Sequence, residues 1–149
     1  MSREVLGARF EPKGVFAANF YRVEGREIGK INEERALALL REMAEEGTFA
    51  RVRRASKRQT HIRGIDMFGI VALNSTAFSE DELRIPFQIK SSFRQGRIFL
   101  GEHQQRRSRN KIIVVVVNET RSDEIIKETI QENVQLLLRY GNRFFQSRV

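Results

Sequence analysis

The fold is decided by two neighbouring segments, Gly64-Ile65-Asp66-Met67-Phe68-Gly69-Ile70-Val71-Ala72-Leu73 and Ile85-Pro86-Phe87-Gln88-Ile89-Lys90-Ser91-Ser92. Both are apolar, rich in β-branched residues and bounded by turn-forming residues, which is typical of short strands. Asp66 opens the first segment, and Gln88 and Lys90 lie two residues apart on the second. Since side chains two apart on a strand point to one face of the sheet, Gln88 and Lys90 should share a face. A carboxylate, an amide oxygen and an ammonium on one face could hold a divalent metal ion beside a phosphate.

These residues resemble the signature of the PD-(D/E)XK nuclease superfamily, which is an Asp on one strand and (Glu/Gln)-x-Lys on the next. Asp66, Gln88 and Lys90 match the three positions in order, in a Gln form that is similar to the Mrr-type branch. The upstream stretch from Glu33 to Arg53 is similar to the helix-then-strand opening of archaeal Holliday-junction resolvases. The resemblance covers residues 30–118.

The resemblance implies an α/β fold with a restriction-endonuclease-like core, in which a mixed central β-sheet is flanked by helices. It also implies a metal-dependent endonuclease that hydrolyses DNA phosphodiester bonds with Mg²⁺ or Mn²⁺, and the resolvase-like opening suggests branched or structured DNA as substrate. Lys90 would steady the attacking water and the negative charge that develops on the phosphate. A homodimer is expected, because two symmetric sites can cut two strands.

Divalent hard cations prefer oxygen ligands. In the family that the motif resembles, the metal would therefore be held by Asp66, Gln88 and the backbone carbonyl of Ile89. A neutral amide is a weaker ligand than a carboxylate, and a further acid should therefore lie nearby. The candidates are Glu33 and Glu34 on the preceding helix. We prefer Glu33 because it shares a helix face with inward-packing apolar residues, although Glu34 is the better letter match to the resolvases.

The rest of the chain predicts helices and one further strand around these two segments. Helical spacing predicts one helix from Asn32, as its N-cap, to Gly47, and a last helix from Ser122, as its N-cap, to Gly141. The other expected elements are a polar strand or loop over 51–63, strands over 65–73, 84–91 and 111–118, and a helix with a basic end over 93–108. Residues 1–29 are expected to form an N-terminal arm or hairpin with a candidate strand over 15–23, residues 30–141 the core, and residues 142–149 a C-terminal tail. This gives one domain over residues 1–149 in the order helix–strand–strand–strand–helix–strand–helix.

The composition narrows the class of protein. A hydrophobic content of 40% with 31% charged residues is typical of a soluble globular domain. With 27 Lys and Arg against 19 Asp and Glu, the net charge of +8 favours a polyanionic partner, of which nucleic acid is the commonest. The absence of cysteine excludes disulfides, a zinc ribbon and a thiol nucleophile. The first residues lack the apolar core of a signal peptide and the apolar run 112–117 is too short to cross a bilayer, so we expect a cytoplasmic protein.

Two basic groups are candidate phosphate contacts, which would give affinity and salt dependence without reading base sequence. The first group is Arg51, Arg53, Arg54, Lys57, Arg58 and Arg63, and the second is Arg106, Arg107, Arg109 and Lys111. His61 and His103 are too isolated to form a zinc site.

Each of these residues also has an ordinary structural interpretation. Asp66 could be a turn residue, Gln88 and Lys90 could lie on the solvated face of a strand, and first-turn glutamates usually complement a helix dipole. Two other functions stay open: an inactive nuclease fold that binds nucleic acid, with Gln88 marking decay of the metal site, and an RNA-processing or RNA-binding protein. Metal-dependent cleavage separates the first from a nuclease, and a panel of DNA and RNA substrates separates the second.

Overall fold

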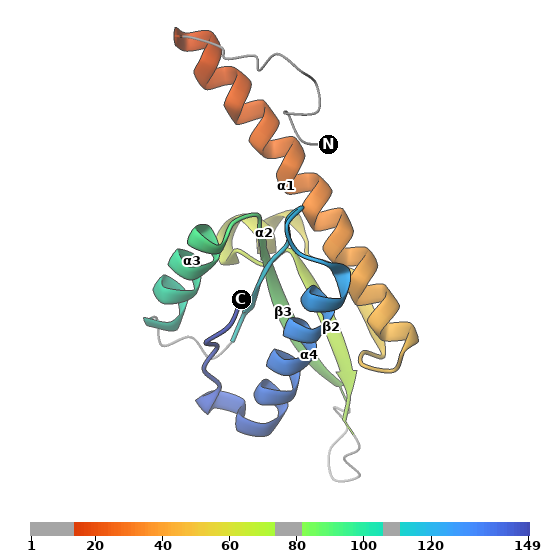
Figure 1. Ribbon diagram of the computed structural model, residues 1–149. Helices are drawn as coiled ribbons and strands as arrows, with labels where there is room; N and C mark the ends of the chain where they lie inside the picture. The colour runs from red at the N-terminus through yellow and green to blue at the C-terminus, as the bar shows by residue number, and fades with distance from the viewer. Residues whose placement is uncertain (1–13, 74–81, 106–110) are drawn as a thin grey trace.

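The computed structural model describes residues 14–73, 82–105 and 111–149, which form a four-stranded sheet with helices on both faces (Figure 1). In chain order the elements are α1 (Gly14–Glu45), β1 (Arg51–Arg54), α2 (Lys57–Arg63), β2 (Met67–Ala72), β3 (Glu82–Lys90), α3 (Phe93–Gln105), β4 (Ile113–Val116), α4 (Asp123–Tyr140) and the short 3₁₀ helix η2 (Gly141–Arg143). The predicted α/β class with a mixed sheet is confirmed. None of the helices described is long and apolar enough to cross a membrane.

The strands lie in the order β1-β2-β3-β4. The pairs β1–β2 and β2–β3 are antiparallel, and β3–β4 is parallel. The β2–β3 register sets Met67 opposite Phe87, and the β3–β4 register sets Phe87 opposite Ile113. All four β4 residues are buried, as the continuous β-branched run predicts for a strand covered on both faces.

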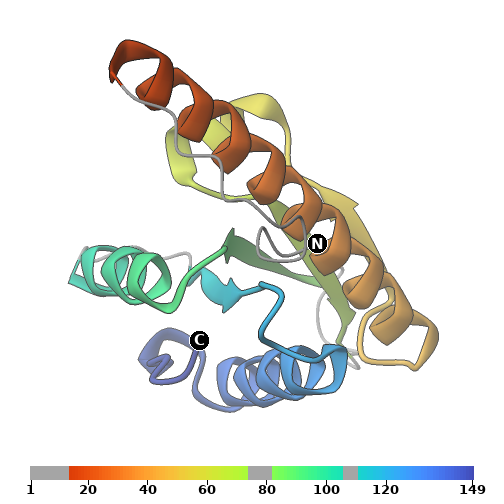
Figure 2. The ribbon, with the colours of Figure 1, turned by 45° about the horizontal axis from the view of Figure 1, so that its top comes forward.

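Helices cover the sheet on both faces (Figure 2), and alternate strand residues pack into two apolar layers, one on each face. On one face α1 and α4 cover the larger core, whose buried members include Leu37, Leu40, Phe87, Ile113 and Ile130. On the other face α3 packs Leu100 against Val114 and Val116. A smaller cluster of Ile65, Phe68 and Ile112 continues this second layer, and the ring of Phe99 packs against both groups.

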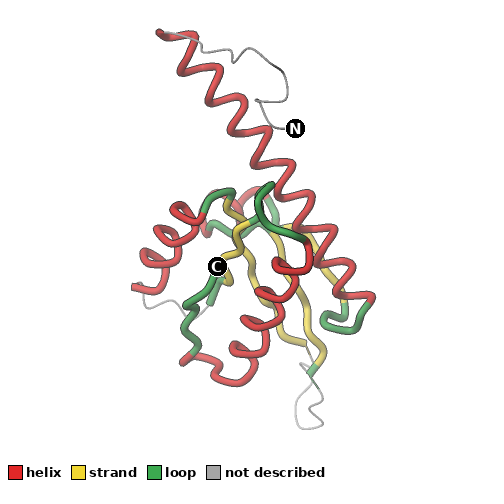
Figure 3. Tube along the Cα trace, in the orientation of Figure 1, coloured by secondary structure: helices red, strands yellow, loops and turns green. Residues whose placement is uncertain are grey.

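Helix α1 is longer than predicted and corrects the interpretation of the N-terminal residues. It runs without interruption from Gly14 to Glu45, so residues 15–23 are helical and not a strand, and its first half extends past the sheet (Figure 3). Asn32 is therefore not an N-cap. It lies within the helix, is buried, and donates from Nδ2 to Ser91 Oγ at 2.9 Å. Its side chain thus makes a tertiary contact through Nδ2 and does not act as a cap, which would accept a backbone N–H through Oδ1. Gly25 and Gly29 weaken the helix without ending it.

The basic stretch 51–63 is a strand followed by a helix, and the prediction of one polar strand or loop was wrong for residues 57–63. Ser56 caps α2 in a capping box with Gln59, and Gly64 ends the helix in the left-handed region at φ 66°. The Ser56-x-x-Gln59 spacing is the local signal for this helix start. The two central strands were predicted within a few residues of their ends, at 67–72 and 82–90.

The C-terminal residues after α4 pack against the domain, with Phe144, Gln146 and Val149 buried. The limits of α4 agree with prediction, with Ser122 as N-cap and Gly141 as C-cap, although Leu138 is exposed and not on the buried face. Beyond α4, Gln146 is buried and its Oε1 accepts from Val114 N at 2.9 Å, while its Nε2 donates to Val114 O. One side-chain amide therefore bonds the outer edge of β4, a device that prevents pairing of an edge strand with another chain.

Candidate functional site

The predicted site residues meet where β2 begins and β3 ends. Asp66 directly precedes β2, and its backbone N–H donates to Phe87 O at 2.8 Å, which continues the β2–β3 pairing by one residue. Gln88 and Lys90 lie on the last part of β3, alternating with the core residues Phe87 and Ile89. Both therefore face the layer covered by α3.

Asp66 is held by a backbone donor and is electrostatically coupled to its neighbours. Its Oδ2 accepts from Ile89 N at 2.7 Å. Burial raises the pKa of Asp66 to about 6; the Ile89 N–H opposes this rise, the charge of Glu33 adds to it, and the charge of Lys90 opposes it. The acid from α1 and the lysine of β3 are thus both close enough to Asp66 to act on its ionisation.

Glu33, and not Glu34, is the acid that α1 brings to Asp66. Burial raises the pKa of Glu33, the Arg54 charge opposes this, the charge of Glu34 adds to it, and that of Lys90 opposes it. Glu34 is exposed and accepts a salt bridge from Arg54 Nη2 at 2.6 Å. The preference for Glu33, which rested on the helix face that it shares with apolar residues, therefore agrees with its position near Asp66 and Lys90.

Gln88 presents a buried oxygen without a partner. The residue is only 8% exposed, and among the described residues its Oε1 has no hydrogen-bond donor. A buried acceptor left unpaired costs about 1–3 kcal/mol, so native proteins rarely keep one without a reason. The N–H and C=O of one strand residue point to the same side. The Ile89 carbonyl consequently opens on the side of Asp66, where the Ile89 N–H donates.

These donors suit a hard divalent cation. Two carboxylates of raised pKa, one unpartnered amide oxygen and one strand carbonyl are all oxygen ligands, and Mg²⁺ needs only one or two carboxylates because it keeps waters and binds substrate phosphate. In the described residues no group of three or more His, Cys, Asp or Glu side chains could hold a metal. The site thus offers two carboxylates, one negative charge fewer than a site with an acid at position 88.

The arginines of the first basic group, on residues 51–63, contact different partners. Arg51 forms a two-pronged ion pair with Glu82 at 2.7 Å on each arm, Arg54 binds Glu34, and the Arg53 guanidinium lies 5.0 Å from the centre of the Phe68 ring. Lys57 and Arg58 are exposed on α2. Arg63 ends α2, but its side chain lies outside the described residues, as do those of His61 and His103. Arg106, Arg107 and Arg109 also lie outside the described part of the chain.

Sequence reasoning did not find three neighbours of the site. Asn32 and Ser91 tie α1 to the end of β3 through their side chains, one residue from Glu33 and Lys90. Phe99 of α3 lies beneath the Lys90 ammonium, with Nζ 5.1 Å from the ring centre. None of these three contacts has a signal in the local sequence. Gly64, which borders the Phe99 ring, does have one, because a glycine with positive φ is typical of a helix end.

Comparison of the chain with protein-family models, with curated proteins and with solved structures found no match.

Proposed function

We propose that this protein is a metal-dependent endonuclease of the PD-(D/E)XK type that hydrolyses phosphodiester bonds in DNA. One observation carries the proposal: the charges of Glu33 and Lys90 act on the part-buried Asp66 carboxyl, and Gln88, two residues before Lys90 on β3, has a buried Oε1 without a partner among the described residues. Two acids of raised pKa, a lysine and an unpartnered buried acceptor gathered at one end of a sheet are more typical of a functional site than of a structural ion pair.

Within the proposal each residue has one task. Asp66 and Glu33 would hold Mg²⁺ or Mn²⁺ together with Gln88 Oε1 and the Ile89 carbonyl. When bound, the ion would polarise the phosphoryl group and lower the pKa of a bound water. Lys90 would donate to the attacking water or to a non-bridging phosphate oxygen, where negative charge grows as the new P–O bond forms and the bond to the leaving sugar oxygen breaks.

The partner would be double-stranded or branched DNA, which the net charge of +8 attracts. Exposed cations flank the site on α2, and Arg26 and Lys30 are exposed on the part of α1 that leads away from Glu33. At 1.5 Å per residue, Arg26 lies about 10 Å along the helix axis from Glu33, which is within reach of phosphates adjacent to the cleaved one. Two protomers would cut two strands.

The decisive experiment is incubation with Mg²⁺ or Mn²⁺ on linear, nicked, flapped and four-way DNA and on matched RNA. We expect the wild type to cut DNA only with metal. Asp66→Ala and Lys90→Ala should lose cleavage, with DNA binding largely kept. Gln88→Glu, which adds a third acid, should keep or raise cleavage at low metal concentration. Equal cutting by wild type and Asp66→Ala would place the activity elsewhere.

A second function, an inactive nuclease fold that clamps nucleic acid, is favoured by the two-carboxylate character of the described site. It predicts that wild type and Asp66→Ala bind DNA equally and that neither cuts any substrate. Restored cleavage in Gln88→Glu alone would show that this residue marks the loss of an ancestral activity.

A further inference from the structure

Lys90 is held by an aromatic ring and not by an acid. No carboxylate among the described residues forms a salt bridge with it, whereas its Nζ lies 5.1 Å from the centre of the Phe99 ring. An ammonium within about 6 Å of a ring centre is attracted to the negative face of that ring. The ring comes from α3, so this contact joins the lysine to a helix on which no other predicted site residue lies.

The Phe99 ring is itself held in place from two directions. It packs against both apolar clusters of the α3 layer, including Leu100 and Phe68. At Gly64 a Cβ would meet Phe99 Cε2 and Cζ at 3.0 Å, so a larger residue would push on the ring edge. The same missing Cβ would lie 3.5 Å from Gln88 Oε1. Gly64, Phe99, Gln88 and Lys90 therefore form one contiguous wall of the site.

We propose that Phe99 is a positioning residue for Lys90: its ring face fixes the ammonium at the attacked phosphate and keeps it from collapsing onto Asp66 and Glu33. This inference rests on the proposed nuclease function. A lysine has four rotatable side-chain bonds, and two nearby acids attract it. A direct ion pair would consume the carboxylates that a metal needs, whereas a ring holds the charge and leaves every oxygen available.

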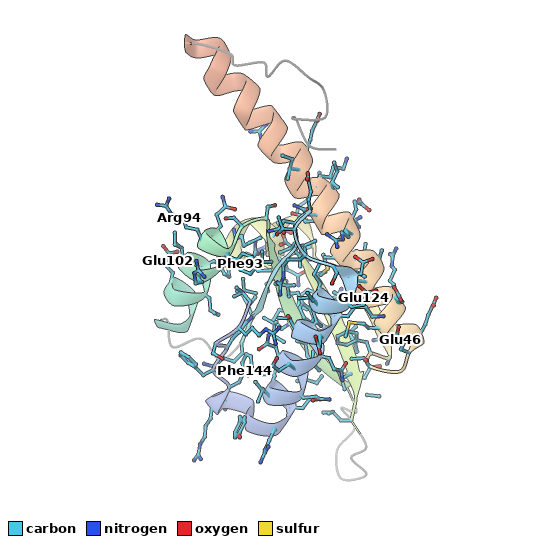
Figure 4. The ribbon with its side chains drawn as sticks, viewed as in Figure 1. Glu46, Phe93, Arg94, Glu102, Glu124 and Phe144 are labelled. Atoms are coloured by element: carbon cyan, nitrogen blue, oxygen red, sulfur yellow. The ribbon has the colours of Figure 1, made fainter. Side chains whose placement is uncertain are left out.

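The contact can be tested without any activity. The Lys90 Cε protons lie over an aromatic face, so their NMR signals should be shifted upfield by the ring current. We expect Phe99→Met to remove this shift. The matched control is Phe93→Leu, since Phe93 is on the same helix and also lies under a cation, with Arg121 Cζ 5.1 Å from its ring centre (Figure 4). The control should leave the Lys90 signals unchanged, and an upfield signal that persists in Phe99→Met would overturn the contact.

The positioning role is tested by cleavage kinetics. Phe99→Met should lower kcat about ten-fold with KM for DNA unchanged, because the ring acts on the lysine and not on the bound DNA. Fluorinated phenylalanines at position 99 keep the shape of the ring and weaken its negative face, so kcat should fall stepwise with fluorination, whereas the same replacements at position 93 should have no effect. Circular dichroism and thermal unfolding would verify that each variant is folded.

The outcomes separate the two proposals. A flat kcat across the fluorinated series would overturn the positioning role even if Phe99→Met lost activity, because only packing would then be involved. Absence of wild-type cleavage on every substrate would overturn the nuclease function and the catalytic role of the ring with it, whereas the NMR result would still decide whether Phe99 holds Lys90.

Discussion

Asp66 is the residue at which folding and function conflict. Burial and the charge of Glu33 disfavour its ionised form, and one backbone N–H from Ile89 compensates only in part. A carboxyl whose pKa is higher in the folded than in the unfolded chain weakens folding at any pH where both states are ionised. The cost is relieved as the pH falls through 6, because the folded protein then takes up the proton first.

We therefore expect Asp66→Asn to stabilise the metal-free protein at pH 8 and to lose that advantage as the pH approaches 4. The rise from 3.8 to about 6, discounted for partial exposure, corresponds to a gain of about 1–3 kcal/mol. Asparagine keeps an oxygen for the Ile89 N–H, so the gain reports charge alone. Urea unfolding across this pH range measures it, with Glu119→Gln in an exposed turn as control. A pH-independent difference would show that the carboxyl is not strained.

At the scale of elements, the edge strand β4 is hydrogen-bonded on its outer side by the Gln146 side chain. Gln146 bonds both the N–H and the C=O of Val114, and its amide also donates to Arg148 O. A backbone strand in this place would bond several residues in succession, whereas Gln146 bonds one. The bonds from Gln146 therefore support β4 on the side away from β3, where β4 pairs with the segment that carries Gln88 and Lys90.

Gln146→Ala should lower the free energy of unfolding by about 2–5 kcal/mol, because it leaves a buried donor and a buried acceptor unpaired. Gln135→Ala, at an exposed position of α4, is the matched control and should change stability little. Thermal or urea unfolding measures both variants. If the two unfold alike, the edge contact contributes nothing and the tail would be dispensable after all.

Across the whole molecule the charge is unevenly distributed. Acids gather in a groove of about 800 Å³ between α1 and α4, where Figure 4 labels Glu46 and Glu124. The other acids of this groove are Glu42, Asp123, Glu128 and Glu132. The groove is net negative although the whole chain carries a net charge of +8, so the remaining surface is more basic than the chain as a whole. Such asymmetry orients a polyanion, since the acidic side repels it.

DNA affinity should therefore fall steeply with salt and depend on which cations are removed. Reversing Lys57 and Arg58 to Glu on α2, next to the site, should weaken binding at least ten-fold and flatten the salt dependence. Reversing Arg139 in the last turn of α4 and Arg143 in η2 to Glu makes the same change in net charge at residues outside the predicted phosphate contacts. Binding titrations at several salt concentrations, without metal, compare the two pairs. Equal losses would mean that net charge alone governs binding.

Local patterns determined much of this protein. The continuous run of β4, the caps of α4 at Ser122 and Gly141, and the common face of Gln88 and Lys90 all follow from residues close together in the chain. Strand alternation and helix capping act over two to four residues, so these features are readable without knowing the fold.

Only the tertiary structure decided the rest, because the deciding partners are far apart in sequence. Asn32 lies inside α1, where its side-chain amide donates to Ser91, 59 positions away. Helix periodicity favoured Glu33 over Glu34, but only the docking of α1 near the end of β3, where Asn32 donates to Ser91, brings Glu33 close to Asp66. Phe99 meets Lys90 through the packing of α3, and Gln146 closes β4 from 32 residues away. Such contacts depend on how helices dock on the sheet, and no local periodicity encodes that docking.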